Sequence, residues 1–160
     1  MAHDPLCPRK LASHLDYGII SLIQFSAVRP HEVSYLRSES GQREFSAITI
    51  CDRGMRLIIH NDAHSQRRQA ANISHELAHG LLIHSPAPLT GAGGGRIFNR
   101  EHEEEANWLG PALLISEEAA LLIAERGQPF DPWAAYYGVS NELLQMRLRV
   151  TGALIRVGRR

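Results

Sequence analysis

The chain has little cysteine, no excess of charge of either sign and no long apolar run. Cys7 and Cys51 lie far apart and outside any C-x-x-C pair, so neither a disulfide framework nor a thiolate zinc site is indicated. Lys and Arg (17) balance Asp and Glu (17), which excludes an overall field that attracts nucleic acid or anionic membrane. No run of about 18 apolar residues occurs, and residues 1–10 hold none of signal-peptide length. We therefore expect a cytoplasmic protein without membrane association.

In other respects the composition is that of an ordinary globular protein. Apolar residues make up 44% and charged residues 21% of the 160 positions, which is enough to bury a core. We interpret residues 1–160 as a single domain in three parts. Residues 1–64 supply a helix and a sheet, residues 65–115 two helices joined by a Gly-rich loop at 85–98, and residues 116–160 a helical C-terminal subdomain.

The first part of the chain carries helix and strand patterns. Helical spacing of leucines predicts a helix over Pro8–Asp16, and the β-branched run after Gly18 predicts a strand over Ile19–Phe25. Phe45–Ile50 and Met55–Ile59 flank a turn-forming segment and predict a hairpin. Together these segments predict a small three-stranded sheet, antiparallel or mixed.

The rest of the chain is predicted to be helical. Ser65 is a suitable cap for a long helix that ends near His84, because Pro86 and Pro88 cannot continue it. Thr90–Gly95 is interpreted as a loop, with a plain linker favoured over a substrate gate. Further helices are predicted over Asn99–Leu114, Ser116–Gly127, Pro132–Tyr137 and Asn141–Val150. The fold class predicted is α+β, with the sheet packed on the long helix.

The long helix contains His75-Glu76-Leu-Ala-His79, an H-E-x-x-H pattern. Residues four apart on a helix differ by about 40° around its axis, so both imidazoles leave one face and can bind one metal ion. Glu76 lies about 100° away, where it can take a proton from a water molecule activated at the metal. The alternative is a pair of ordinary histidines on a helix, since nine histidines raise the frequency of chance matches.

Glu103 is the candidate for a third ligand, which a catalytic zinc site usually requires. On the second long helix it falls within the apolar stripe, whereas Glu101, Glu104 and Glu105 fall on the polar side and are interpreted as solvated charges. A carboxylate in an apolar stripe needs a partner that offsets its desolvation, and a metal ion held by His75 and His79 is such a partner. The apolar residues that define the stripe are Ala106, Leu109, Gly110, Leu113 and Leu114.

Other polar residues are candidates for further roles in the same site. His102 also faces inward and is either a ligand or a hydrogen-bonded core histidine, of which we favour the second. The Asn107 amide is a candidate acceptor for the non-ligating N–H of a zinc histidine, with capping or packing as equal alternatives. A donor for a reaction oxyanion is expected from His102, Arg96, Tyr136 or Tyr137, among which the sequence does not choose.

These segments resemble the ImmA/IrrE family of zinc metallopeptidases. Arg68–His84, with the sequence RQAANISHELAHGLLIH, is similar to the zinc helix of that family, and Glu103–Leu114 to its Glu-x-x-Ala-Asn/Asp segment. The resemblance extends over roughly residues 8 to 152 and includes the leading helix, the hairpin and the C-terminal helices. Ile115-Ser116 replaces the usual Met-Pro of the family, and Gly110-Pro111 replaces small residues. Pro111 is expected to kink the second helix or end it early.

The resemblance implies a zinc endopeptidase that binds one Zn²⁺ per chain through His75, His79 and Glu103, with Glu76 as the base. It also implies a protein substrate, namely a DNA-binding repressor of the helix-turn-helix (Xre/Cro) type encoded nearby, cleaved during stress response or mobile-element regulation. Other members pair with such a regulator as toxin and antitoxin. The alternative function is therefore a toxin-like or regulatory binding protein that does not cleave its partner.

A further alternative is a DNA-binding module with a structural metal, in which Asn141–Arg149 contacts the duplex. Its support is the basic C-terminal region, although a solvated helix face and a frayed tail explain the same charges. We expect no direct binding to nucleic acid. The arginines concerned are Arg147, Arg149, Arg156, Arg159 and Arg160.

Overall fold

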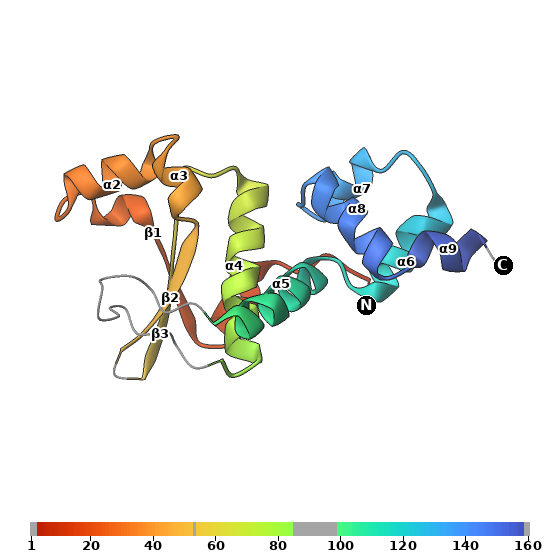
Figure 1. The fold of residues 1–160 in the computed structure, drawn as a ribbon, viewed down its shortest axis with the longest axis horizontal. Coiled ribbons are helices and arrows are strands. Elements are labelled where there is room, and N and C mark those ends of the chain that lie inside the picture. The colour runs from red at the N-terminus through yellow and green to blue at the C-terminus, as the bar shows by residue number, and fades with distance from the viewer. Residues whose placement is uncertain (1–2, 53, 85–98, 159–160) are drawn as a thin grey trace.

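A computed structural model describes residues 3–52, 54–84 and 99–158 of the chain. Figure 1 shows a sheet and its helices at one end of the molecule, a group of helices at the other, and α5 (Arg100–Leu114) between them. The α+β class and the helical C-terminal part are confirmed. No helix among the described residues is long and apolar enough to cross a membrane.

The sheet has the strand order β1-β3-β2. β1 (Tyr17–Ser21) pairs in parallel with β3 (Met55–His60), and β2 (Ala47–Asp52) pairs antiparallel with β3. The predicted hairpin is thus confirmed, and the sheet is mixed. The predicted first strand is wrong in its second half, because Ser21 and Gln24 form a capping box that starts the 3-10 helix η1 (Leu22–Phe25).

Two helices between β1 and β2 were not predicted. They are α2 (Pro30–Arg37) and α3 (Gly41–Glu44). Only Val33 of α2 and Gly41 of α3 are buried in them. Helices with so small a buried face lack the apolar periodicity on which a sequence assignment depends.

α4 (Gln66–Leu81) is the predicted long helix, and Ser65 caps it by accepting a hydrogen bond from the N–H of Arg68 (3.3 Å). Its apolar face packs on the sheet and on α1 (Pro8–His14). Burial of such a face supplies most of the stability of a helix in a protein. The buried residues of this first core are Ala12, Tyr17, Ile58, Ile73 and Leu77.

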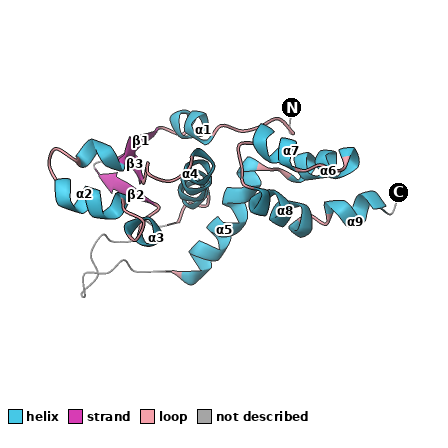
Figure 2. Cartoon of the chain, turned by 90° about the horizontal axis from the view of Figure 1, so that it is seen from above, coloured by secondary structure: helices cyan, strands magenta, loops and turns pink. Residues whose placement is uncertain are grey.

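α5 begins after Asn99, whose side chain accepts hydrogen bonds from the first turn, and continues to Leu114. The predicted end of the helix at Leu114 is confirmed, so an early end at Pro111, one of the two effects expected of this residue, does not occur. Proline removes the bond to the carbonyl four residues earlier, which belongs to the solvent-exposed Asn107, so water can satisfy that carbonyl. Figure 2 shows α5 running obliquely from the sheet side to the helical side. Leu113 packs on the first core, and Leu114 belongs to the second.

The second core is formed by the C-terminal helices. Three of them were predicted, and the fourth, α9, follows a glycine with positive φ at Gly152. Since α9 is short and contributes a single buried side chain, Ala153, its sequence shows no apolar periodicity from which a helix could be predicted. The helices are α6 (Glu117–Arg126), α7 (Asp131–Tyr136), α8 (Asn141–Val150) and α9 (Ala153–Gly158).

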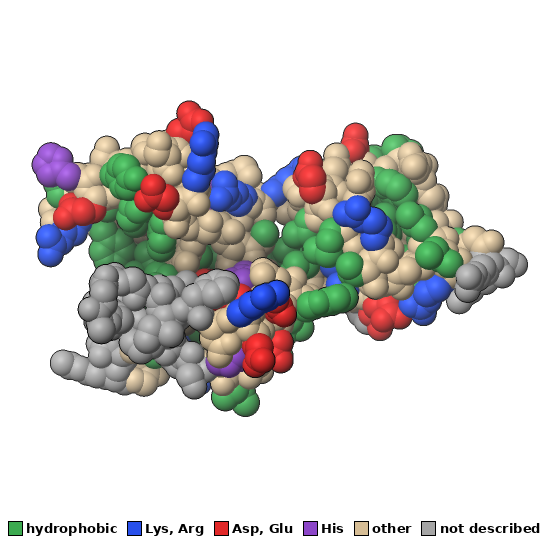
Figure 3. Space-filling model, viewed as in Figure 1, with side chains coloured by type: hydrophobic (Ala, Val, Ile, Leu, Met, Phe, Trp, Pro, Cys, Tyr) green, Lys and Arg blue, Asp and Glu red, His purple; other side chains and the backbone are tan. Residues whose placement is uncertain are grey.

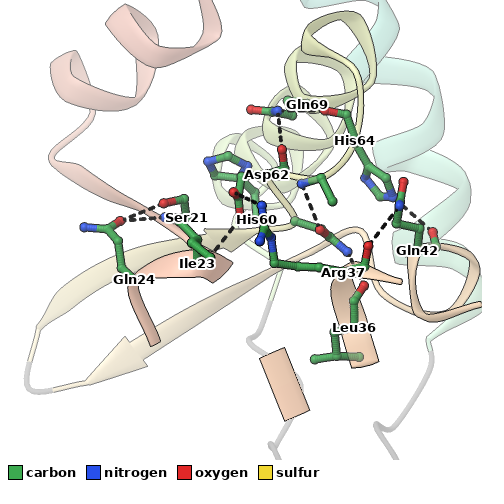
Figure 4. Close-up of polar contacts among 12 residues, drawn as sticks. Ser21, Ile23, Gln24, Leu36, Arg37, Gln42, His60, Asp62, His64 and Gln69 are labelled. Carbon is green, nitrogen blue, oxygen red and sulfur yellow. Dashed lines mark hydrogen bonds and ion pairs between the residues drawn. The ribbon is translucent and has the colours of Figure 1, made fainter. Parts of the chain in front are cut away.

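A polar network ties the connection between β3 and α4 to its surroundings (Figure 4). Asp62 in this connection accepts hydrogen bonds from the N–H of Ile23 (3.0 Å) and from Nη2 of Arg37 (3.1 Å). Gln69 of α4 donates to the carbonyls of Asp62 (3.2 Å) and His64 (2.8 Å). These bonds hold the start of α4 against the end of β3 and so orient the helix that carries the H-E-x-x-H pattern.

Two histidines of this network, His60 and His64, are buried, and burial lowers the pKa of both below the ordinary value of 6.5. Arg9, whose Nη2 lies 3.1 Å from His60 Nε2, lowers the pKa of His60 further, while Asp62 opposes this shift. These two histidines therefore bind more protons in the unfolded chain than in the folded chain once the pH falls below about 6.5. We expect their contribution to the free energy of unfolding to be highest above that pH and to decrease as the pH falls below it.

Urea unfolding of the metal-free protein at about pH 7.5 and about pH 5.5 measures this effect. His60→Gln is expected to show a smaller decrease than the wild type, because the neutral amide has no proton to take up on unfolding. The exposed His31 on α2 provides the control, and His31→Gln should retain the wild-type decrease. An undiminished decrease in His60→Gln would show that this histidine does not cause the pH dependence.

Candidate metal centre

His75 and His79 lie one turn apart on α4 and point to the same region. Their Nε2 atoms are 3.1 Å apart. Their side chains are 25% and 15% exposed, so both imidazoles remain partly accessible. The i, i+4 spacing thus brings two nitrogen donors together, as the periodicity of a helix requires.

Glu103, in the first turn of α5, supplies an oxygen donor to the same region. Its Oε2 lies 3.2 Å from Nε2 of His75, and its Oε1 lies 3.6 Å from Nε2 of His79. The three ligand atoms lie within 4.8 Å of one another, and this is the one such group of His, Cys, Asp and Glu within the described ranges. Two imidazole nitrogens and one carboxylate oxygen are a donor set of catalytic zinc sites, so these residues fit a divalent metal ion.

Gly110 allows α5 to approach α4 closely at His75. A Cβ at position 110 would lie 3.1 Å from Cα of His75 and 3.2 Å from its backbone nitrogen, closer than carbon atoms normally pack. Gly110 and Glu103 lie on the same helix, α5. The distance between α4 and α5 at Gly110 therefore also sets how far the Glu103 side chain must extend to reach the two imidazoles. The missing side chain thus has a direct geometric role in the candidate site.

Gly110→Val is expected to lower the free energy of unfolding by about 1–3 kcal/mol, because the added methyl groups force the two helix backbones apart. Zinc binding should weaken as well, since Glu103 moves away from the imidazoles. Urea unfolding and a zinc titration measure the two effects. Ala112→Val is the control on the same helix, because Ala112 lines an open groove and not the α4 contact. Equal stability of the two variants would contradict this account.

Glu76 lies on α4 beside the histidines and is only 3% exposed. Its Oε2 accepts a hydrogen bond from Oγ1 of Thr49 on β2 at 2.7 Å. This contact joins the sheet to the carboxylate and holds it in one orientation. Thr49 was not predicted, although its position as a polar residue between Ile48 and Ile50 in an apolar strand was an available signal.

Comparison with known families agrees with this arrangement. The family model of the M78 peptidases, described as the IrrE N-terminal-like domain, matches residues 29–149. The chain belongs to this peptidase family. The matched region includes both helices of the candidate metal centre, and the resemblance stated from the sequence is confirmed. No curated protein and no solved structure gave a significant match.

The peptidase has a second layer of polar residues around His79, most of which was not predicted. Nδ1 of His84 lies 2.9 Å from Nδ1 of His79, and Nε2 of His84 lies 2.8 Å from Oε2 of Glu105. His102 stacks on His84, with ring centroids 4.1 Å apart and planes at 7°. Glu105 is exposed, as predicted, but it is bonded to a histidine, so the interpretation as a charge with water as its only partner is wrong. Figure 3 shows acidic side chains gathered over the start of α5, with histidines beside them.

The other candidate residues of this M78 peptidase lie elsewhere. Asn107 is solvent-exposed, and Nδ1 of His79 is contacted by His84. Tyr136 and Tyr137 are at the end of α7, which both ribbon views show away from the start of α5. Tyr137 is buried in the second core and donates its O–H to the carbonyl of His3 (2.6 Å). Neither tyrosine is therefore placed to stabilise an oxyanion at this site.

Two predictions fall outside the described residues. They concern the loop Thr90–Gly95 and Arg96 as an oxyanion donor. Of the remaining oxyanion candidates, His102 is on the helix that carries Glu103 and stacks against the second layer.

Proposed function

We propose that this M78 peptidase is a zinc-dependent endopeptidase in which His75, His79 and Glu103 hold the ion and Glu76 is the general base. The observation that carries the proposal is the convergence of three donor atoms within 4.8 Å beside a buried glutamate. A zinc ion bound there would supply Lewis-acid chemistry, which acidifies a water ligand and polarises a carbonyl group.

The residues of the chain supply the proton transfers. Glu76 accepts the proton of the attacking water on a carboxylate oxygen and later passes it to the nitrogen of the leaving amine. Thr49 donates to Oε2 of this carboxylate and so limits its rotation during both transfers. The partly exposed ligand side chains leave one side on which water and a peptide can approach.

The edge of the sheet supports binding of an extended peptide. In the described part of the chain β2 pairs with β3 alone, so its outer edge offers backbone N–H and C=O groups. Thr49 belongs to this strand and contacts Glu76, so a peptide that adds to the edge by strand pairing runs past the proposed base. This mode requires an extended segment of a protein substrate.

The substrate we propose is a DNA-binding repressor of the helix-turn-helix type encoded beside this gene, in keeping with the resemblance described above. Direct binding of the peptidase to nucleic acid is not part of the proposal. Arg147 is 5% exposed and donates from Nε to the carbonyl of Ile115 (2.8 Å), and Arg156 pairs with Glu117. Two of the arginines that suggested DNA binding are thus engaged within the chain.

Incubating the zinc-loaded peptidase with the neighbouring regulator tests the proposal directly. We expect a limited number of cleavage products by intact-mass spectrometry, and none after treatment with a chelator. Readdition of zinc should restore cleavage. A stable complex of the two proteins without any cleavage would instead favour the toxin-like binding function.

A further inference from the structure

We propose that His84 and Glu105 are positioning residues that fix the tautomer and the ring orientation of His79 for metal binding. This inference rests on the proposed function, because it assigns His79 as a ligand. Three observations carry it: the turn that places His84, the directions of the hydrogen bonds, and the burial of the ring.

The end of α4 directs His84 back towards His79. The N–H of His84 bonds to the carbonyl of His79 (3.0 Å), and the N–H of Ile83 bonds to the carbonyl of Gly80 (3.2 Å). This pair of bonds is a Schellman motif, which needs a residue with positive φ at its turn. Ile83 occupies that position with a φ of 57°, which is uncommon for a β-branched residue, and its side chain is 89% exposed. The chain therefore keeps a strained turn that brings the imidazole of His84 to His79.

With both imidazoles neutral, the hydrogen bonds have a single set of directions. The carboxylate of Glu105 can only accept, so Nε2 of His84 donates to it (2.8 Å). A neutral His84 then has its lone pair on Nδ1 and accepts from Nδ1–H of His79 (2.9 Å). Nε2 of His79 is left with its lone pair directed at the region shared with His75 and Glu103. This is the tautomer that a metal ligand requires.

The ring of His84 is held in place on its faces as well as at its nitrogens. Its side chain is 6% exposed, whereas that of Glu105 is 59% exposed. The ring of His102 stacks on it in a nearly parallel orientation, and the ring of His79 meets it edge-on at 5.1 Å. The imidazole thus has little freedom to turn away from His79. The chain of hydrogen bonds from His79 through His84 ends at the Glu105 carboxylate on the surface.

The test is the zinc affinity of the full chain, measured by competition with a chromophoric chelator. His84→Phe keeps an aromatic ring but removes both nitrogens, and we expect zinc to bind about 10- to 100-fold more weakly. His84→Gln retains an amide oxygen able to accept from Nδ1–H of His79, so it should recover part of that loss. A merely structural role for the ring predicts the opposite order, because Phe preserves the stacking and Gln does not.

Glu105 and its neighbour Glu104 are both exposed on α5, so variants of the two can be compared without a change in the core. Glu104 is bonded to Arg100 and not to a histidine. Glu105→Gln is expected to weaken zinc binding, and Glu104→Gln to leave it unchanged. Nitrogen NMR of the zinc-loaded wild type should show His79 protonated at Nδ1.

The outcomes separate this inference from the proposed function. A wild type that binds no zinc overturns the proposed function itself. If the wild type binds zinc, and His84→Phe and the two glutamate variants bind it with the same affinity as the wild type, only the positioning role of His84 and Glu105 is overturned. If His84→Phe does not fold, the comparison of Glu105→Gln with Glu104→Gln decides the inference.

Discussion

Glu76→Gln is expected to slow peptide-bond cleavage by about two to four orders of magnitude while the zinc content stays at the wild-type level. The amide keeps the size of the side chain and can still contact Thr49, but it cannot accept the proton of the attacking water. Because Glu76 is not among the three converging donors, the metal site remains complete. The measurement combines the initial rate of cleavage of the partner regulator with metal analysis of the purified variant.

Glu101→Gln is the control for this experiment, since Glu101 is an exposed carboxylate at the start of α5. It should retain the wild-type rate. Undiminished turnover in Glu76→Gln would defeat the assignment of Glu76 as the base, and loss of zinc from that variant would assign it to the ligand set instead.

Glu103→Ala is expected to lose both zinc and activity. At a free zinc concentration of 100 times the dissociation constant, binding to the folded state stabilises a protein by about 2.7 kcal/mol. The variant removes the only donor that α5 contributes to the converging group in the described residues, so most of this zinc-dependent stabilisation should disappear. Thermal unfolding with and without zinc measures the difference, and metal analysis gives the stoichiometry.

The neighbouring Glu104 again provides a matched control, because it is exposed and bonded to Arg100. Glu104→Ala should keep the wild-type response to zinc. Full zinc occupancy in Glu103→Ala, with Glu105 or His102 proving essential, would show that the third ligand was assigned to the wrong residue of α5.

Much of the fold follows from local patterns. Ser65 was predicted to cap a helix and does so in the structure. The helices predicted to start at Asn99, Ser116 and Asn141 begin within one residue of these positions. The hairpin also follows from its apolar runs and its turn. The errors lie where local signals are weak or are overridden. The first strand ends at a capping box, and α2, α3 and α9 bury too few side chains to show a period.

The candidate site divides in the same way. The sequence alone determined that His75 and His79 share a helix face and that Glu103 lies in the apolar stripe of its own helix, because helical periodicity is a local property. Only the tertiary structure decided that Glu103 lies 3.2 Å from His75, 28 residues away in the chain, and that Thr49 holds Glu76. It also decided that His84, and not Asn107, contacts the outer nitrogen of His79. The reason is physical: these distances depend on how closely α5, β2 and the end of α4 pack, which no periodicity within one segment specifies.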